Sequence, residues 1–323
     1  VNVKATADND VGKTIDITAI AGGLGAVSLG AALSFADITN NVDASLISGA
    51  SAGSGTVTVI AEDKTDIDSE ALGAAIGISY AAGIVASEAE KNSTIDASVG
   101  GVVTAANATV TAADQGKVKS LGQSAAGGLS GAGAGAHVTA IDGASVTARS
   151  LDNTTFNLGS GALNIIASAT PQTEAKADGV AVSGGLSIGA SISDAQVSTT
   201  INSWLGRNTT VNAGGLTLTA RQLRSGISES AKATSFAASG GLLLGASATT
   251  SDADAIVVLD SHVGDNSTLN LGSGTAAITA SVDSKQYSKS SGINAGFVAA
   301  GFNEASATSD NDINASLGNT VKV

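Results

Sequence analysis

Several residue types are absent or scarce in this chain of 323 residues. It contains no cysteine, no methionine, one proline and one tryptophan, and only 2% of its residues are aromatic. Without cysteine, the chain can have neither a disulfide framework nor a thiolate metal site. The 43% of hydrophobic residues consist largely of alanine. A thick core of large side chains would therefore be hard to fill, and the composition predicts a thin interior lined by small aliphatic residues.

Charge is also scarce, because only 13% of residues are charged, against about 25% in average globular domains. The 28 acidic and 15 basic residues give a net charge of −13. This excess of acid argues against nucleic acid or an anionic membrane as a partner. The uncharged run 17–36 contains glycine and serine and has counterparts in the other repeats, so we expect no membrane insertion. The chain opens at Val1 with no signal segment, and we expect a fragment of a longer protein.

A short alternating segment that ends in alanine recurs along the chain. The copies begin at Val1, Val57, Ala108, Leu163, Leu216 and Ala276, which are 56, 51, 55, 53 and 60 residues apart. Self-similarity at such a period is typical of repeat architectures. We therefore predict a single array of about six repeats of roughly 55 residues, with approximate bounds 1–56, 57–107, 108–162, 163–215, 216–275 and 276–323.

An aliphatic residue followed by Asp or Asn forms a second landmark. The Asx positions are Asp43, Asp96, Asp142, Asn202, Asp260 and Asn314. A small residue precedes each Asx by seven positions, at Ala36, Ala89, Gly135, Ala195, Ala253 and Ala307. Asp and Asn tolerate tight backbone conformations and bond to nearby backbone. We interpret this column as structural, at a corner of each repeat.

Each repeat also contains a zone without Asp, Glu, Lys or Arg. These zones are 17–36, 71–87, 120–141, 179–193, 233–251 and 290–303. Apolar residues in them occupy every second position, and their parity changes at the end of the zone, between Ile192 and Ala195 and between Ala86 and Ala89. Because strand side chains alternate with period two, the change predicts an extra residue at a bulge or corner.

Period two, frequent glycine and abundant Val, Ile, Thr and Ser favour strands over helices. Stacked strand repeats form a solenoid, in which each repeat pairs with the next. The predicted fold is therefore all-β, a β-solenoid resembling a parallel β-helix. No half-period of about 27 residues is visible, which favours one wide rung per repeat over two ordinary rungs.

No chemical motif stands out against this repeating background. The acidic clusters 8–10, 63–68, 252–254 and 310–312 are interpreted as solvated loops, with calcium as the alternative. His137 and His262 have no partner motif, and Trp204 with Arg207 is the only aromatic candidate for a binding site. We predict no catalytic, cofactor-binding or metal-binding residue and no enzyme activity.

The V-x-V-x-A strand, the uncharged zone GGLSIGASIS and the I-[DN]-x-x-[LV] segment resemble repeat regions of giant secreted bacterial surface proteins. These are adhesins of the filamentous-haemagglutinin and autotransporter-passenger kind. The resemblance extends over the whole chain but is one of pattern and composition. It implies a β-solenoid shaft outside a prokaryotic cell, and it transfers no functional residue.

From these observations we expect a structural or adhesive shaft or filament segment, extracellular or on a prokaryotic cell surface. Uncharged faces and edges are what associating β-proteins keep, so self-association into fibres or stacked solenoids is the expected partnership. A cell-surface or glycan partner is a further possibility. The alternatives are a solenoid module that binds glycan, calcium or ice, and a β-helix enzyme that acts on polysaccharides.

Overall fold

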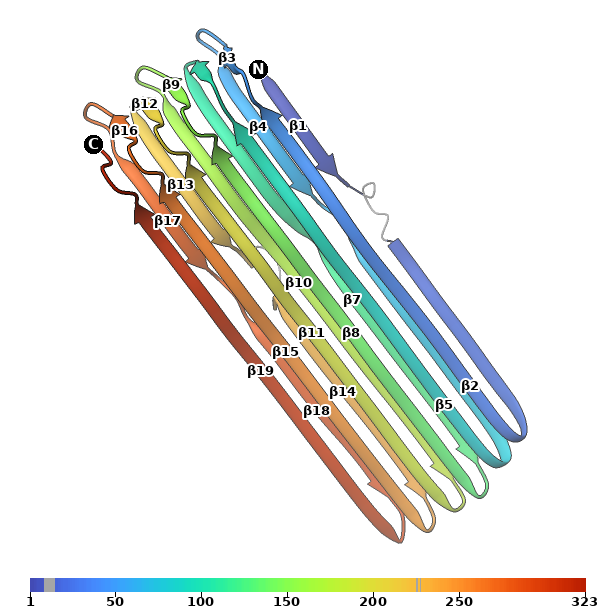
Figure 1. Ribbon diagram of the computed structural model, residues 1–323. Coiled ribbons are helices and arrows are strands. Elements are labelled where there is room, and N and C mark those ends of the chain that lie inside the picture. Colours follow the sequence, from blue (N-terminus) through green and yellow to red (C-terminus); the bar gives the residue numbers. More distant parts are fainter. Residues whose placement is uncertain (9–14, 225, 227) are drawn as a thin grey trace.

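The chain is built entirely from β-strands. The computed structural model describes residues 1–8, 15–224, 226 and 228–323. Within these residues the strands form a 14-stranded sheet and a 5-stranded sheet, and every strand pair is parallel. The predicted all-β solenoid is confirmed. Figure 1 shows successive turns of the chain side by side, with both termini at the same end of the strands.

Each turn has a forward strand, a tip, a return strand and a short third strand. The forward strands are β1 (Asn2–Ala7) with the first part of β2 (Ile15–Leu46), β4 (Thr56–Asp63) with the first part of β5 (Ile67–Val99), β7 (Asn107–Gly128), β10 (Ala162–Ser183), β13 (Gly215–Gln222) with β14 (Ala231–Gly241), and β17 (Ala276–Val282) with β18 (Gln286–Ala295). The return strands are the second part of β2 and of β5, then β8 (Gly131–Ser150), β11 (Leu186–Leu205), β15 (Leu244–Val263) and β19 (Val298–Leu317). The short strands are β3 (Gly49–Ser51), β6 (Val102–Thr104), β9 (Thr155–Asn157), β12 (Thr210–Asn212) and β16 (Thr268–Asn270).

The pairing register agrees with the first sequence landmark. Leu163 lies opposite Ala108 on one side and Leu216 on the other. The Asn157 and Asn212 amides, 55 residues apart, are hydrogen-bonded neighbours. One sequence period therefore makes one wide turn, in which the chain runs out along one layer of the 14-stranded sheet and back along the opposite layer.

The second landmark is wrong in one repeat. Ile95 and Ile201 both lie opposite Val146, and Asn202 lies opposite Thr147. Thr147 therefore occupies the position that the sequence pattern assigns to Asp142, and Ala140 occupies the position assigned to Gly135. The Ile141-Asp142 pair matches the pattern only by chance. The Asx residues also lie within continuous return strands and not at a corner.

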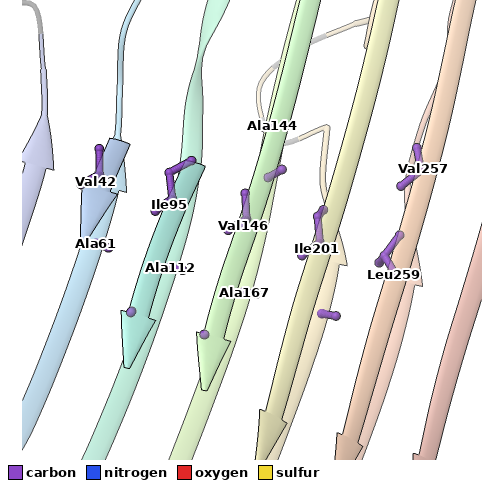
Figure 2. Packing of buried hydrophobic residues seen from close by; sticks show 14 of the residues in the cluster. Val42, Ala61, Ile95, Ala112, Ala144, Val146, Ala167, Ile201, Val257 and Leu259 are labelled. Carbon is purple, nitrogen blue, oxygen red and sulfur yellow. The ribbon is translucent and has the colours of Figure 1, made fainter. Parts of the chain in front are cut away.

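The half of the molecule that carries the short strands has an ordinary apolar interior. Inward side chains of forward and return strands, such as Ile165 and Ile201, are fully buried there. Figure 2 shows such aliphatic residues in columns along the solenoid axis. The 5-stranded sheet adds a column of four buried side chains, Val103, Phe156, Val211 and Leu269. These residues close the open side of the core.

In the other half, which ends at the tips, small residues face the interior and many large apolar residues face outward. We call this half the blade, and it consists of the uncharged zones 17–36, 71–87, 120–141, 179–193, 233–251 and 290–303. In β11, Ser187 and Ser191 are buried, whereas Ile188 and Ile192 face outward. The predicted corner between Ile192 and Ala195 is absent, because β11 runs unbroken through it. The parity changes because apolar residues pass from the outer face to the inner face.

Close approach of the two sheets explains the small interior of the blade. A methyl group at Gly83 would lie 2.5 Å from the Ala125 carbonyl oxygen, and one at Gly189 would lie 2.9 Å from that of Ala238. Ordinary sheets pack about 10 Å apart with side chains between them. Most inward residues of the blade are glycine, alanine and serine, and the larger Val85 and Val138 fit where they face Gly73 and Gly122.

Buried serine hydroxyls in the blade bond to one another along the solenoid axis. Ser34 Oγ lies 2.8 Å from Ser69 Oγ. Ser87 donates to Ser69, and Ser120 donates to Ser87 at 2.8 Å. A buried hydroxyl without a partner is costly, so this chain of hydrogen bonds makes a serine-lined interior tolerable.

Candidate functional site

The outer surface of the blade is unusual because it exposes large apolar side chains. Its apolar side chains belong to inner turns as well as to the ends of the stack. Ile84 is 52% exposed, Ile188 56% and Leu129, at a tip, 69%. Monomeric soluble proteins rarely expose contiguous apolar patches of more than a few hundred Å². The blade carries such residues on both outer faces and around its tip.

Two shallow hollows mark this surface. One, of about 470 Å³, lies on the outer face of the forward strands and is lined by residues that include Ile20, Leu72, Val180 and Phe236. The other, of about 390 Å³, lies at the tips and is lined by Leu24, Ile76, Ile78 and Leu129 among others. Both cross several turns of the solenoid, so the apolar surface is corrugated along its axis.

A belt of ion pairs borders the blade on its forward face. Lys119 Nζ lies 3.0 Å from Asp68 Oδ2, and Lys232 Nζ lies 2.9 Å from Glu174 Oε1. These four residues occupy one column of the register. Burial raises the pKa of Glu174, but hydrogen bonding and charge from Lys232, together with Lys117, hold it below its usual value. Charge thus begins where the blade ends.

A second unusual feature lies inside the molecule, between the apolar core and the blade. Lys91 in β5, Asp114 in β7 and Asp142 in β8 have fully buried side chains. Lys91 Nζ lies 2.9 Å from Asp114 Oδ1 and 3.3 Å from Asp142 Oδ1. Asp63 is also buried, opposite Asp114 in the register. We call these four residues the charged layer.

The pKa shifts in the charged layer follow from burial and mutual charge. Burial raises the pKa of Asp142 to about 7 against the opposing charge of Lys91, and it also raises that of Asp114. Burial lowers the pKa of Lys91, but Asp114, Asp142 and Asp63 together hold it above its usual value. For Asp63, hydrogen bonds from Ser93, Thr65 and Asn40 and the charge of Lys91 outweigh burial and lower its pKa.

The acidic clusters of the sequence do not behave alike. Asp63 is buried, so the interpretation of 63–68 as a solvated loop is wrong at this position. Asp252 is partly exposed, and 310–312 is exposed on β19. The 8–10 cluster lies partly outside the described residues. In the part of the chain that the structure describes, no three His, Cys, Asp or Glu residues are placed to hold a metal ion.

Trp204 has partners that the sequence pairing with Arg207 does not identify. Its ring stacks on His262 with centroids 5.7 Å apart, and the Arg149 guanidinium lies 5.6 Å from its centroid. Arg149 belongs to the preceding turn and His262 to the following one. Both ring faces of Trp204 are therefore covered by its own column. Arg207 lines the same shallow surface hollow as Trp204.

The two histidines have partners in the structure. His262 Nδ1 lies 2.7 Å from Asp260 Oδ2. His137 Nε2 lies 3.6 Å from Asp194 Oδ2 on the next turn. Neither contact places a histidine beside the charged layer or the hollows of the blade. Both are partly exposed surface pairs that connect residues of the return strands.

Repeated asparagines mark the turns between the return strands and the short strands. Asn153, Asn208 and Asn266 have positive φ of 59°, 53° and 58°, a conformation that asparagine tolerates better than most residues. Farther along each turn, Asn212 donates to Asn157, and Asn270 donates to Asn212, both at 2.8 Å. The segments that begin at Asn153, Asn208 and Asn266 therefore form turns, and the asparagines that follow them form a ladder of hydrogen bonds between successive turns of the solenoid.

The sequence contained one signal for the charged layer that the repeat pattern conceals. Lys91 and Asp142 lie at inward positions, opposite Ile38 and Val197 in neighbouring turns. A charged residue at a position that is aliphatic in other turns is the observation that could have located it. Locating the charged layer from the sequence requires the correct register of the third repeat. The false match at Asp142 shifts that register by five residues.

Comparison of the chain with known protein families, curated proteins and solved structures gives no match. No described segment forms a helix with the length and hydropathy needed to cross a membrane. The functional proposals therefore rest on the geometry of the blade and of the charged layer.

Proposed function

We propose that this chain is a shaft or filament segment of an extracellular prokaryotic surface protein, and that it self-associates through the blade. One observation carries the proposal: large apolar side chains cover the outside of the blade on inner turns, whereas its interior is lined mainly by glycine, alanine and serine. The role is structural and adhesive. The resemblance to secreted surface adhesins supports the same interpretation.

A second copy of this chain is the occupant that the surface fits best. The outer face of the blade is largely apolar, and Asp178 lies at the hollow on its forward face, so two blades can pack while burying little charge. Burial of apolar area stabilises such contacts by about 25 cal/mol per Å² before the cost of association. The acidic residues that give the net charge of −13 lie outside the blade, where they stay solvated and repel one another less.

The strand ladders offer a second route of association along the axis. Among the described strands, β19 pairs only with β15, and β2 pairs only with β5. Their outer backbone groups form open edges, which are templates for further strands. Solenoids gain stability from each added neighbour. End-to-end stacking therefore complements lateral contact between blades.

Substitution of outward apolar residues by lysine tests the lateral contact. We expect the Ile84→Lys/Ile188→Lys variant to raise the concentration needed for assembly at least tenfold, or about 1.4 kcal/mol. Sedimentation velocity across a concentration series measures the assembly, and negative-stain images show its form. Both side chains face outward, so circular dichroism should show an unchanged β-fold.

Gln196→Lys is the matched control, because Gln196 faces outward on the same strand, β11, but beyond the blade. It should associate like the unmodified chain. An unmodified chain that remains single at every concentration would overturn the proposal. Equal loss of assembly in the control and the blade variant would show that added charge, and not the blade, is responsible.

A further inference from the structure

The charged layer joins the two sheets across the interior of the solenoid. Lys91 projects inward from the return part of β5, Asp114 from the forward strand β7 and Asp142 from the return strand β8. Lys91 and Asp142 are lateral neighbours in the register. Asp114 faces them from the opposite sheet, so the contact between Lys91 and Asp114 spans the core.

The layer is unbalanced in charge and in hydrogen bonds. One ammonium group meets three carboxylates in a region closed to water. Asp114 Oδ2 and both oxygens of Asp142 accept no well-aligned hydrogen bond. Charges buried in this way cost several kcal/mol each unless they are paired and fully hydrogen-bonded. Conversion of the Lys91 ammonium and one carboxylate to a neutral amide removes two of these buried charges, and Asp142, which then lacks the Lys91 charge, binds a proton more readily.

Asp63 differs from the other two carboxylates because its hydrogen bonds are complete. It accepts from the Thr65 amide at 3.0 Å and the Thr65 hydroxyl at 2.7 Å. Asn40 Nδ2 donates to it at 3.1 Å, and Ser93 Oγ donates to it as well. Asp63 is thus held in place as a carboxylate, and Asp114 and Asp142 are left to react with Lys91.

We propose that Lys91 and Asp114 form an intramolecular isopeptide bond, with Asp142 as the residue that carries the proton. The bond would join Nζ of Lys91 to Cγ of Asp114. Nothing in the proposed self-association requires it, so the two proposals stand independently. Asp114 is the acceptor because its carboxylate is the one hydrogen-bonded to Nζ, at 2.9 Å.

The atoms balance without an added reagent. Lys91 passes one proton to the Asp142 carboxylate, which leaves a neutral amine as nucleophile. The nitrogen attacks Cγ of Asp114, and a C–N bond forms. One carboxyl oxygen of Asp114 departs as water, with a proton from Asp142 and a second from the nitrogen. Asp142 ends as the carboxylate it was at the start. The ion pair becomes a neutral amide.

The bond would link the two layers of strands covalently at the border between the blade and the half of the molecule that carries the short strands. Lys91 and Asp114 lie 23 residues apart, and the segment between them includes the short strand β6. Closing this loop covalently reduces the conformational entropy of the unfolded chain. In a shaft under tension, such a bond keeps β5 and β7 together when other contacts open.

Mass spectrometry of the denatured full chain tests the proposal. We expect an intact mass lower than the sequence mass by one water, and a branched peptide that joins the Lys91 and Asp114 segments after proteolysis. Mapping the branch distinguishes the isopeptide bond from a cyclised aspartate, which loses the same mass. A purified, folded chain at its full sequence mass after prolonged incubation would overturn the proposal, as would a branch from Lys91 to Asp142.

Three variants assign the roles. Lys91→Arg and Asp114→Ala should show their full sequence masses, because each removes one of the bonded groups. Asp142→Asn should slow or abolish the loss of water in a chain whose circular dichroism shows an intact β-fold. A variant at Asp142 that reacts as fast as the unmodified chain would contradict its role in proton transfer. Lys119→Arg, at an exposed ion pair with Asp68, should keep the lower mass.

Discussion

Gly83 shows how a single residue sets the thickness of the blade. A methyl group there would lie 2.5 Å from the Ala125 carbonyl oxygen on the opposite sheet, closer than any packed carbon can approach. The sheets must separate to accommodate even alanine. Because separation opens the serine contacts of the interior as well, the cost extends beyond one contact.

We expect Gly83→Ala to lower the free energy of unfolding by about 1–3 kcal/mol, the usual cost of overpacking. Urea denaturation followed by circular dichroism measures it. Gly133 on the neighbouring strand β8 has open space at its Cβ position, so Gly133→Ala should change stability by no more than about 0.5 kcal/mol. Similar losses in the two variants would contradict the close approach of the sheets.

Asp142 provides a pH-dependent prediction at the same scale. Its pKa is raised from 3.8 to about 7 in the folded chain, so the folded state binds its proton more tightly than the unfolded state does. Stability from this group is therefore full below about pH 4 and is lost as the pH rises to about 7. If Lys91 forms an isopeptide bond, the pKa of Asp142 stays raised, because the positive charge that lowers it is gone. Stability still falls as the pH rises.

Asp142→Asn should therefore flatten the pH profile of the free energy of unfolding across that interval. Urea midpoints at several pH values provide the comparison. The profile of the unmodified chain should slope downward with rising pH more steeply than that of the variant. Parallel profiles would show that Asp142 does not titrate in this way.

At the scale of the strand, the sequence was sufficient for the period and for most of the register. Strand alternation and the alanine-ended segments follow backbone geometry directly, and the predicted starts at Ala108, Leu163 and Leu216 are paired in the structure. The third repeat was misaligned at its Asx landmark. Ile141-Asp142 imitates that landmark five residues before the true position at Val146-Thr147, which has no Asx.

Which face of a strand is buried could not be predicted in the blade. Ile188 and Ser187 alternate as in any amphipathic strand, and alternation alone places the isoleucine inside. The structure places it outside because the opposing backbone leaves no room for it. That distance depends on a strand of the neighbouring turn, which no local pattern reports. For this reason the parity change after Ile192 predicts a corner that the strand does not have.

At the scale of the whole molecule, each turn combines two kinds of interior. The half that carries the short strands has an aliphatic core closed by the 5-stranded sheet. The blade has a thin core of small residues and an apolar exterior. The charged layer lies between them. Because successive turns repeat this division, the solenoid exposes apolar side chains along its axis, and the proposed self-association uses that surface.

The absence of cysteine permits a direct test of this inside-out arrangement. Single substitutions Ile188→Cys and Ser187→Cys place adjacent thiols on opposite faces of β11, and a water-soluble maleimide measures their accessibility in dilute, unassembled protein. The account predicts rapid labelling at position 188, protection at position 187, and equal labelling of both in urea. Protection at 188 with rapid labelling at 187 would contradict it.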